Sequence, residues 1–152
     1  MMRHPLPCEA EWLTDLAMRS KAWWGYDASF MQACRQELTT TVGQIEQELT
    51  WVLVCDETVV GFHRLSPQTA HMVMLDMLFV DPPHMGKGYG KTLLQHAIAK
   101  ARHKGFQELQ VVSDPCALAF YEHMGAEQFD RAPSGSIAGR WLPKLRFLLT
   151  LP

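Results

Sequence analysis

The most informative stretch of the chain is residues 80–92, which read VDPPHMGKGYGKT. Gly86, Gly88 and Gly90 leave this loop poor in side chains, so that its backbone N–H groups can approach a ligand closely. The residues that follow predict a helix, and the N–H groups of a helix's first turn have no partners within the helix and carry the positive end of its dipole. The stretch therefore predicts a phosphate-binding loop; a glycine-rich turn without a ligand is the alternative.

Two common nucleotide-binding loops do not fit this stretch. A Walker A loop that ends in Gly90, Lys91 and Thr92 requires glycine at position 85, where the chain has Met85. A dinucleotide fingerprint that starts at Gly86 requires glycine at position 91, where the chain has Lys91. The spacing therefore argues against a P-loop phosphotransferase and against a Rossmann-type domain.

The sequence before the loop predicts two helices and three consecutive strands. Apolar residues recur at helical spacing over residues 9–20 and 28–38, and Asp27 can cap the second helix. Three apolar runs bounded by turn residues predict strands, the first two as a hairpin: residues 51–55, 59–65 and 71–80. The phosphate-binding loop is thus expected at the end of the third strand.

The sequence after the loop alternates helix and strand. The apolar spacing predicts a helix over residues 90–103 that Gly105 stops, and another over residues 115–124 that Asp114 caps and Gly125 stops. Strands are predicted for residues 109–112, for a piece after Ala126 and for residues 145–151. This order indicates an α/β (α+β) chain with a mixed, mainly antiparallel sheet, built as a single domain over residues 1–152.

Composition and charge exclude several classes of function. Fourteen Lys and Arg against sixteen Asp and Glu give a net charge of -2, so the chain lacks the basic excess that nucleic-acid binding uses. No apolar run approaches the roughly 20 residues that cross a bilayer. The N-terminal residues are polar, without a signal-peptide core, so we expect a cytoplasmic protein with no membrane partner. The cysteines and histidines show no metal-ligand spacing, and we expect neither a metal nor a disulfide.

Two motifs resemble those of the GCN5-related N-acetyltransferases. Residues 85–90, MGKGYG, are similar to the family's pyrophosphate loop, with Met85 in place of the usual Gln or Arg. Residues 113–126, SDPCALAFYEHMGA, are similar to the family's segment Asn-x-x-Ala-x-x-Phe-Tyr-x-x-x-Gly-Phe, with Asp114 in place of Asn and Ala126 in place of Phe. The motifs stand in the family's order, and together with the order of elements the resemblance covers nearly the whole chain.

The resemblance implies a GNAT-like sheet of about six or seven strands flanked by about four helices. It also implies an enzyme that uses acetyl-CoA as co-substrate, without a metal. The acetyl group would pass to a primary amine of a small molecule or peptide by direct attack of the amine on the thioester. The residues that the resemblance places around the cofactor are Leu78, Phe79, Val80, Met85, Gly86, Lys87, Gly88, Tyr89, Gly90, Lys91, Asp114 and Tyr121.

The resemblance also implies roles in catalysis. Tyr121 matches the tyrosine that protonates the departing CoA thiolate, although packing against the core is its plainer interpretation. The backbone N–H of Leu78 or Phe79 is the expected oxyanion donor. Asp76 is the first candidate for the base that takes a proton from the amine, and His63 is the second.

The acceptor site is expected near the break between the first two predicted helices. Trp23, Trp24 and Tyr26 lie where the family lines this site, with His63 on a neighbouring strand; burial of the tryptophans in the core is the alternative. An inactive acyl-CoA-binding sensor of the same fold is the alternative function, because Met85 departs from the motif and no glutamate base is evident. The apolar run 145–151 leaves a homodimer interface and a core strand both open.

Overall fold

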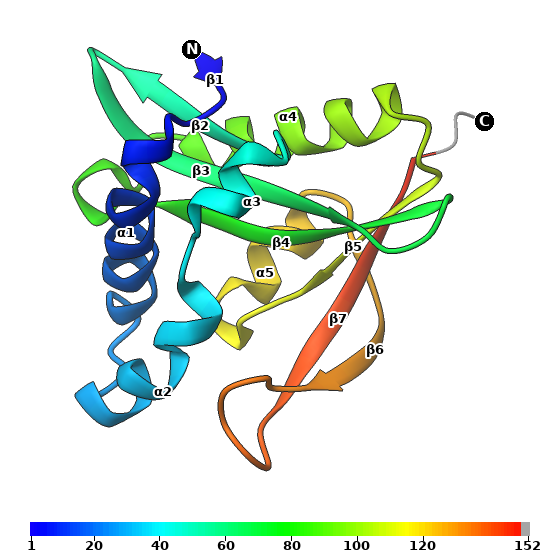
Figure 1. Cartoon of the computed structure of the whole chain (residues 1–152). Helices are drawn as coiled ribbons and strands as arrows, with labels where there is room; N and C mark the ends of the chain where they lie inside the picture. Colours follow the sequence, from blue (N-terminus) through cyan, green and yellow to red (C-terminus); the bar gives the residue numbers. More distant parts are fainter. Residues whose placement is uncertain (150–152) are drawn as a thin grey trace. The chain divides into compact units, whose positions relative to one another are not determined.

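A computed structural model of the chain describes residues 1–149 (Figure 1). Its strands are hydrogen-bonded as a seven-stranded sheet in the order β1-β2-β3-β4-β5-β7-β6. Strands β4 and β5 pair in parallel, whereas β1–β2, β2–β3, β5–β7 and β6–β7 pair antiparallel. The predicted mixed, mainly antiparallel sheet is therefore confirmed.

The helices and strands follow in chain order as β1 (Met2–Arg3), α1 (Ala10–Ala22), α2 (Ala28–Leu38), α3 (Val42–Glu46), β2 (Thr50–Cys55), β3 (Thr58–Pro67), β4 (Met72–Val80), α4 (Tyr89–His103), β5 (Glu108–Val112), α5 (Leu118–His123), β6 (Glu127–Pro133) and β7 (Trp141–Leu148). Short 3-10 helices cover Pro7–Glu9, Pro82–His84 and Pro115–Ala117. Among residues 1–149, no helix combines the length and the apolar character that a membrane crossing requires.

Local sequence signals place several elements correctly. The Asp27 carboxylate accepts a hydrogen bond from the Phe30 N–H at 2.8 Å, as expected of the cap of α2. Asp56 and Glu57 adopt positive φ values of 49° and 62° between β2 and β3, which is the turn geometry that matches the twist of a hairpin. Gly105 has a φ of 89° after α4, as a left-handed helix stop requires.

Two expectations need correction. The helix predicted over residues 115–124 begins as a 3-10 turn and becomes α-helical only at Leu118, because Ala117 lies near φ -101° and ψ -2°, between the two. The last strand begins at Trp141 and not at Leu145, because its first half pairs with β6 and carries half-buried or exposed side chains that leave no apolar run. Leu151, the end of that predicted strand, lies outside the described residues.

Helix α3 raises the number of α-helices in the described chain to five where about four were expected. It is five residues long, too short for an apolar period to reveal it. Its signal is a capping box: the Gln44 N–H donates to Thr41 Oγ1 at 3.1 Å, and the Thr41 N–H donates to Gln44 Oε1 at 2.9 Å.

The chain divides into two compact units, each assembled from two separate segments. Unit 1 consists of Met1–Arg64 with Met77–Leu94, and unit 2 consists of Leu65–Asp76 with Gln95–Pro152. The division therefore does not follow the order of the chain, and each unit is described by itself.

Unit 1 has two apolar clusters. In the larger one, α1 and α2 pack with β2, β3 and the end of β4; its buried residues are Leu13, Leu16, Ala17, Met31, Cys34, Leu38, Val52, Val59, Phe62 and Met77. The smaller one joins Leu53, Val60 and Leu93 of β2, β3 and α4, with Leu78, Val80 and Tyr89 packed against them. Side chains from alternate positions of β4 thus enter different clusters.

The end of β4 is held by an irregularity in β3. The β2–β3 register changes from Leu53 opposite Gly61 to Val54 opposite Val59, which makes Val60 the extra residue of a β-bulge. The Val60 carbonyl accepts a hydrogen bond from the Asp81 N–H at 2.9 Å, directly after β4. The bulge therefore ties the start of the glycine loop to β3.

Gly61, beside the bulge, permits a close approach that no other residue would allow. A Cβ at this position would lie 2.6 Å from the Phe79 carbonyl oxygen and 2.8 Å from Leu93 Cδ1. Both distances are below van der Waals contact, so the last residues of β4 and the first turns of α4 pack directly on the β3 backbone.

Unit 2 contains β5, the β6–β7 hairpin (orange to red in Figure 1) and α5. Apolar residues at alternate positions are buried in β5 and β7: Leu109, Val111, Leu145 and Phe147. Arg146 of β7 forms ion pairs with Glu108 at 3.6 Å and with Glu127 at 3.4 Å, which join β7 to the strands on either side.

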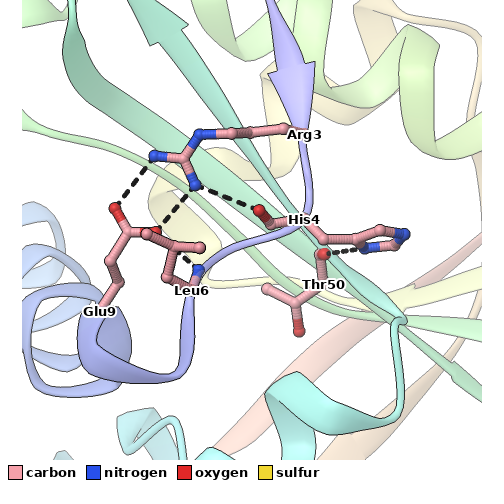
Figure 2. Close-up of polar contacts among 5 residues, drawn as sticks. All are labelled: Arg3, His4, Leu6, Glu9 and Thr50. Carbon is pink, nitrogen blue, oxygen red and sulfur yellow. Dashed lines mark hydrogen bonds and ion pairs between the residues drawn. The ribbon is translucent and has the colours of Figure 1, made fainter.

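The N-terminal segment of unit 1 is held by a bidentate ion pair (Figure 2). Arg3 donates to both oxygens of Glu9, at 2.8 and 3.1 Å, and the Leu6 N–H donates to Glu9 Oε1 at 2.7 Å. His4 Nδ1 lies 3.0 Å from the Thr50 carbonyl oxygen. The hydrogen bonds from Arg3 lower the pKa of Glu9.

The close approach at Gly61 predicts the effect of a single methyl group. We expect Gly61→Ala to lower the free energy of unfolding by about 1–3 kcal/mol, because backbone or Leu93 must shift to make room. Gly43→Ala is the matched control: its Cβ would meet Thr41 Oγ1 at 3.8 Å, and alanine favours helix α3 by up to about 1 kcal/mol. Urea denaturation measures both, and equal effects of the two substitutions would contradict the packing at Gly61.

The Arg3–Glu9 pair predicts a pH-dependent contribution to stability. The folded pKa of Glu9 is lowered, so its contribution is complete above the unfolded pKa of about 4.3 and disappears as the pH falls through the folded pKa. We expect Glu9→Gln to destabilise the protein by about 0.5–1 kcal/mol at pH 7, and the difference from wild type to vanish in acid. Chemical denaturation from pH 7 to pH 3 measures this, and a difference independent of pH would refute it.

Candidate functional site

The predicted loop follows β4 in unit 1 and leads into α4. Gly86 and Gly88 have φ values of 80° and 82°, in the left-handed region that favours glycine. A Cβ at either position would meet no atom within 4 Å. The two glycines are therefore required by backbone conformation, and the space beside them is open to a ligand.

The loop ends at the N-terminus of a fifteen-residue helix. The Gly88 carbonyl accepts the Thr92 N–H at 3.2 Å and the Thr92 hydroxyl, also at 3.2 Å. This bond makes Gly88 the cap residue, so the N–H groups of Tyr89, Gly90 and Lys91 belong to the first turn and have no helical acceptor. Exposed Lys87 lies next to them in the chain, and the arrangement is suited to an anionic group.

The Tyr89 side chain packs toward β2. A hydrogen bond with the Cys55 thiol raises the pKa of Tyr89, and the ring packs against the cluster of Leu53, Val60 and Leu93. The His84 ring lies 6.5 Å from the Tyr89 ring, centroid to centroid. Tyr89 thus anchors the first turn of α4, and its contact with the cofactor stays a prediction.

Strand β4 carries the other residues predicted near the cofactor. Leu78, Phe79 and Val80 are half-buried in unit 1, and Met85 of the loop is half-buried too. The parallel pairing of β4 with β5 joins residues 72–74 to residues 108–110, and β4 continues beyond it to Val80. Asp76 is exposed, in the part of β4 that belongs to unit 2.

Unit 2 places Tyr121 in α5 with 6% of its surface exposed. Burial raises the pKa of Tyr121 far above neutrality. The Phe120 ring packs edge-on to it, with centroids 5.2 Å apart. The hydroxyl is therefore protonated at neutral pH, and burial disfavours its ionised form.

Asp114 caps the 3-10 turn before α5, as expected. Its carboxylate accepts the Cys116 N–H at 2.8 Å and forms an ion pair with Arg140 at 3.7 Å. Arg140 follows Gly139 in the loop between β6 and β7, so the pair fixes this loop against the turn. A contact of Asp114 with the cofactor stays a prediction.

The tryptophans predicted near the acceptor site are on the surface and not in the core. Trp23 is 57% exposed and Trp24 is 43% exposed, and their rings meet edge to face at 5.3 Å. The Tyr26 ring stacks on Phe30 at 4.1 Å, and Lys21 Nζ lies 5.6 Å from the Tyr26 centroid. The end of α1 and the start of α2 thus present an aromatic surface.

His63 is not part of this surface. It is fully buried in β3, and its ring stacks on Trp51 of β2 at 5.2 Å. Asp76, the other candidate base, is exposed. Neither role is tested by the structure.

Two structural features beside the loop were not predicted from the sequence: the close packing at Gly61, and an ion pair between Arg19 and Asp81. A lone glycine in an apolar strand run is a known sign of a bulge or of close backbone approach, so Gly61 carried a usable signal. The partner of Asp81 lies 62 positions away in the chain, and no local pattern could have identified it.

Solved structures show the same fold. PaiA N-acetyltransferase from Thermoplasma acidophilum, in complex with coenzyme A, superposes with a TM-score of 0.82 at 21% identity, over 97% of this chain and 98% of that one. YncA, a putative acetyltransferase from Salmonella typhimurium with its cofactor acetyl-CoA, gives a TM-score of 0.70 at 17% identity, over 100% and 95% of the chains.

Curated proteins match the sequence of this chain over part of their length. The uncharacterized N-acetyltransferase YjgM of Escherichia coli (strain K12) is 32% identical over 88 residues, which are 54% of this chain and 53% of that protein. The chain spans about half the length of the curated relatives it matches.

The family model described as the acetyltransferase (GNAT) family matches residues 13–126. The matched stretch contains the glycine loop, the start of α4 and Tyr121. It covers more than half of the sequence. The chain therefore belongs to the acetyltransferase (GNAT) family.

Proposed function

We propose that the protein is an N-acetyltransferase that moves the acetyl group of acetyl-CoA to a primary amine of a small molecule or peptide. The observation that carries this proposal is the open loop of Gly86 and Gly88 in front of the unpaired first turn of α4. Membership of the family supports it, as do the structural neighbours named with coenzyme A and acetyl-CoA. Cytoplasmic location and a homodimer stay predictions from the sequence.

The loop fits the pyrophosphate of the cofactor. Backbone N–H groups of residues 86–91 would bind its oxygens, because Gly86 and Gly88 present no side chains and the helix dipole favours negative charge. Lys87 and Lys91 are exposed and add positive charge. Met85 has no side-chain donor, so binding in this chain would depend on the backbone more than in relatives with Gln or Arg.

Acetyl-CoA supplies a reactive thioester when bound, so the chain's own residues have to orient it and to move protons. The N–H of Leu78 or Phe79 would donate to the carbonyl oxygen as it gains negative charge. Asp76 would take the proton that the attacking amine loses. Asp76 is exposed, so it could pass that proton on to solvent.

Tyr121 would supply the proton for the departing thiolate. As the C–N bond forms and the C–S bond breaks, the sulfur takes up the Tyr121 proton. The hydroxyl is protonated at neutral pH, and because burial disfavours the tyrosinate, its proton would have to move as the C–S bond breaks. The resulting tyrosinate would recover its proton from solvent before the next turnover.

The loop proposal predicts a specific loss of binding. We expect Gly88→Ala to raise the Kd of coenzyme A about 5- to 30-fold, because a residue with a Cβ resists the left-handed conformation by about 1–2 kcal/mol and would turn the N–H groups away. Gly105→Ala is the control, since Gly105 has a φ of 89° at the other end of α4 and its substitution carries the same strain. Isothermal titration calorimetry compares them; equal Kd values would refute the loop as the binding site.

The proposed acid predicts a loss of turnover without a loss of binding. We expect Tyr121→Phe to lower kcat by about 10²- to 10⁴-fold, because the thiolate then leaves without a proton. The Kd of coenzyme A should stay unchanged, since the ring is preserved. Thiol release from acetyl-CoA with a panel of primary amines measures kcat. Unchanged kcat would remove Tyr121 from the mechanism, and wild-type binding without any thiol release would favour the inactive sensor.

A further inference from the structure

A bidentate ion pair joins α1 to the start of the glycine loop. Arg19, in the last turn of α1, places Nε 3.0 Å from Asp81 Oδ1 and Nη2 2.9 Å from Asp81 Oδ2. Asp81 is the residue between the end of β4 and the 3-10 turn Pro82–His84. Two parallel N–H···O bonds fix direction as well as distance, so the pair sets the position of Asp81 relative to α1.

Asp81 is bonded through its backbone as well as its side chain. Its N–H donates to the Val60 carbonyl at 2.9 Å, and its own carbonyl accepts the His84 N–H at 2.8 Å. The residue is 8% exposed. Asp81 thus connects β3, α1 and the 3-10 turn at a single point, immediately before the loop residues that the proposed function uses.

Arg19 is held on its other side by an aromatic ring. The Trp12 ring lies two helical turns earlier on α1, with its centroid 5.7 Å from Arg19 Cζ. The hydrogen bonds to Asp81 raise the pKa of Arg19, and an arginine guanidinium is charged at neutral pH in any case. The ring and the carboxylate together restrict the rotamers of an otherwise flexible side chain.

Asp81 is also the acidic residue of the segment 80–92, which otherwise contains Lys87 and Lys91. An anion-binding loop is disturbed by an unneutralised carboxylate at its start, because like charges repel more strongly where water is partly excluded. Arg19 pairs with this carboxylate and offsets its charge.

We propose that Arg19 is a positioning residue for the glycine loop: through Asp81 it fixes the start of residues 81–88 and so holds the N–H groups of α4's first turn ready for the cofactor pyrophosphate. The proposal rests on the proposed function for the identity of the ligand. A loop with three glycines loses much conformational freedom when it binds, and fixing its start in advance reduces that loss.

The test compares Arg19→Gln with Arg3→Gln in the full chain. Arg3 forms the same kind of bidentate pair, with Glu9, also in unit 1 (Figure 2). In the ligand-free protein we expect Arg19→Gln to speed amide hydrogen exchange in peptides covering residues 82–92, whereas Arg3→Gln leaves these peptides unchanged. The KM of acetyl-CoA should rise roughly 5-fold or more with Arg19→Gln, while kcat at saturation stays close to wild type.

Further variants separate positioning from general stability. Arg19→Lys keeps the positive charge but loses the paired N–H donors of the guanidinium. Its amide exchange rates and its KM for acetyl-CoA should therefore lie between those of wild type and Arg19→Gln. Asp81→Asn removes the carboxylate, and the double variant with Arg19→Gln should be no worse than Arg19→Gln alone, because both act on one interaction. If Arg19→Gln does not fold, Arg19→Lys and Asp81→Asn carry the same comparison.

The outcomes are distinguishable. The proposal is overturned if Arg19→Gln lowers the free energy of unfolding but changes neither the amide exchange of residues 82–92 nor the KM of acetyl-CoA. The ion pair would then only stabilise the fold. Wild-type protein that binds no coenzyme A would reject the proposed function, but the exchange experiment uses no ligand and would still decide whether Arg19 holds the loop.

Discussion

Direct backbone packing at Gly61 is the constraint on which the candidate site depends. Because β3 has no side chain there, the Phe79 carbonyl and the Leu93 side chain occupy the space that a Cβ would need. The bulge at Val60 turns a carbonyl toward the Asp81 N–H at the same place. The end of β4, the start of the loop and the first turns of α4 are therefore all positioned by two consecutive residues of β3.

The loop combines local freedom with fixed ends. Gly86 and Gly88 adopt conformations that expose backbone N–H groups, and the hydrogen bonds between Gly88 and Thr92 fix the point where α4 begins. At the other end, Asp81 is bonded to β3 and α1. A site of this kind binds an anion with dipoles that are already oriented, so little reorganisation opposes binding. Tyr121, in unit 2, is buried, and burial disfavours the ionised form of its hydroxyl.

A structural feature could be predicted from the sequence when the residues that form it lie close together in the chain. The Asp27 cap, the turn at Asp56 and Glu57 and the stop at Gly105 were predictable, since each is set by residues next to one another. Helix α3 was missed because five residues are too few to show a period. The exposure of Trp23 and Trp24 was left open, because a tryptophan at a helix end is consistent with core and surface alike.

The sequence by itself determined the family, the order of the longer helices and strands and the glycine loop, because glycine spacing, caps and apolar periods act over a few residues. Only the tertiary structure decided that the end of β4 packs against the backbone of Gly61 and that His63 is buried. It also decided that Arg19 binds Asp81, which lies 62 positions further along the chain. Such contacts depend on which strands and helices come together in space. Chain proximity carries no information about them, and the folded arrangement alone brings their partners within bonding distance.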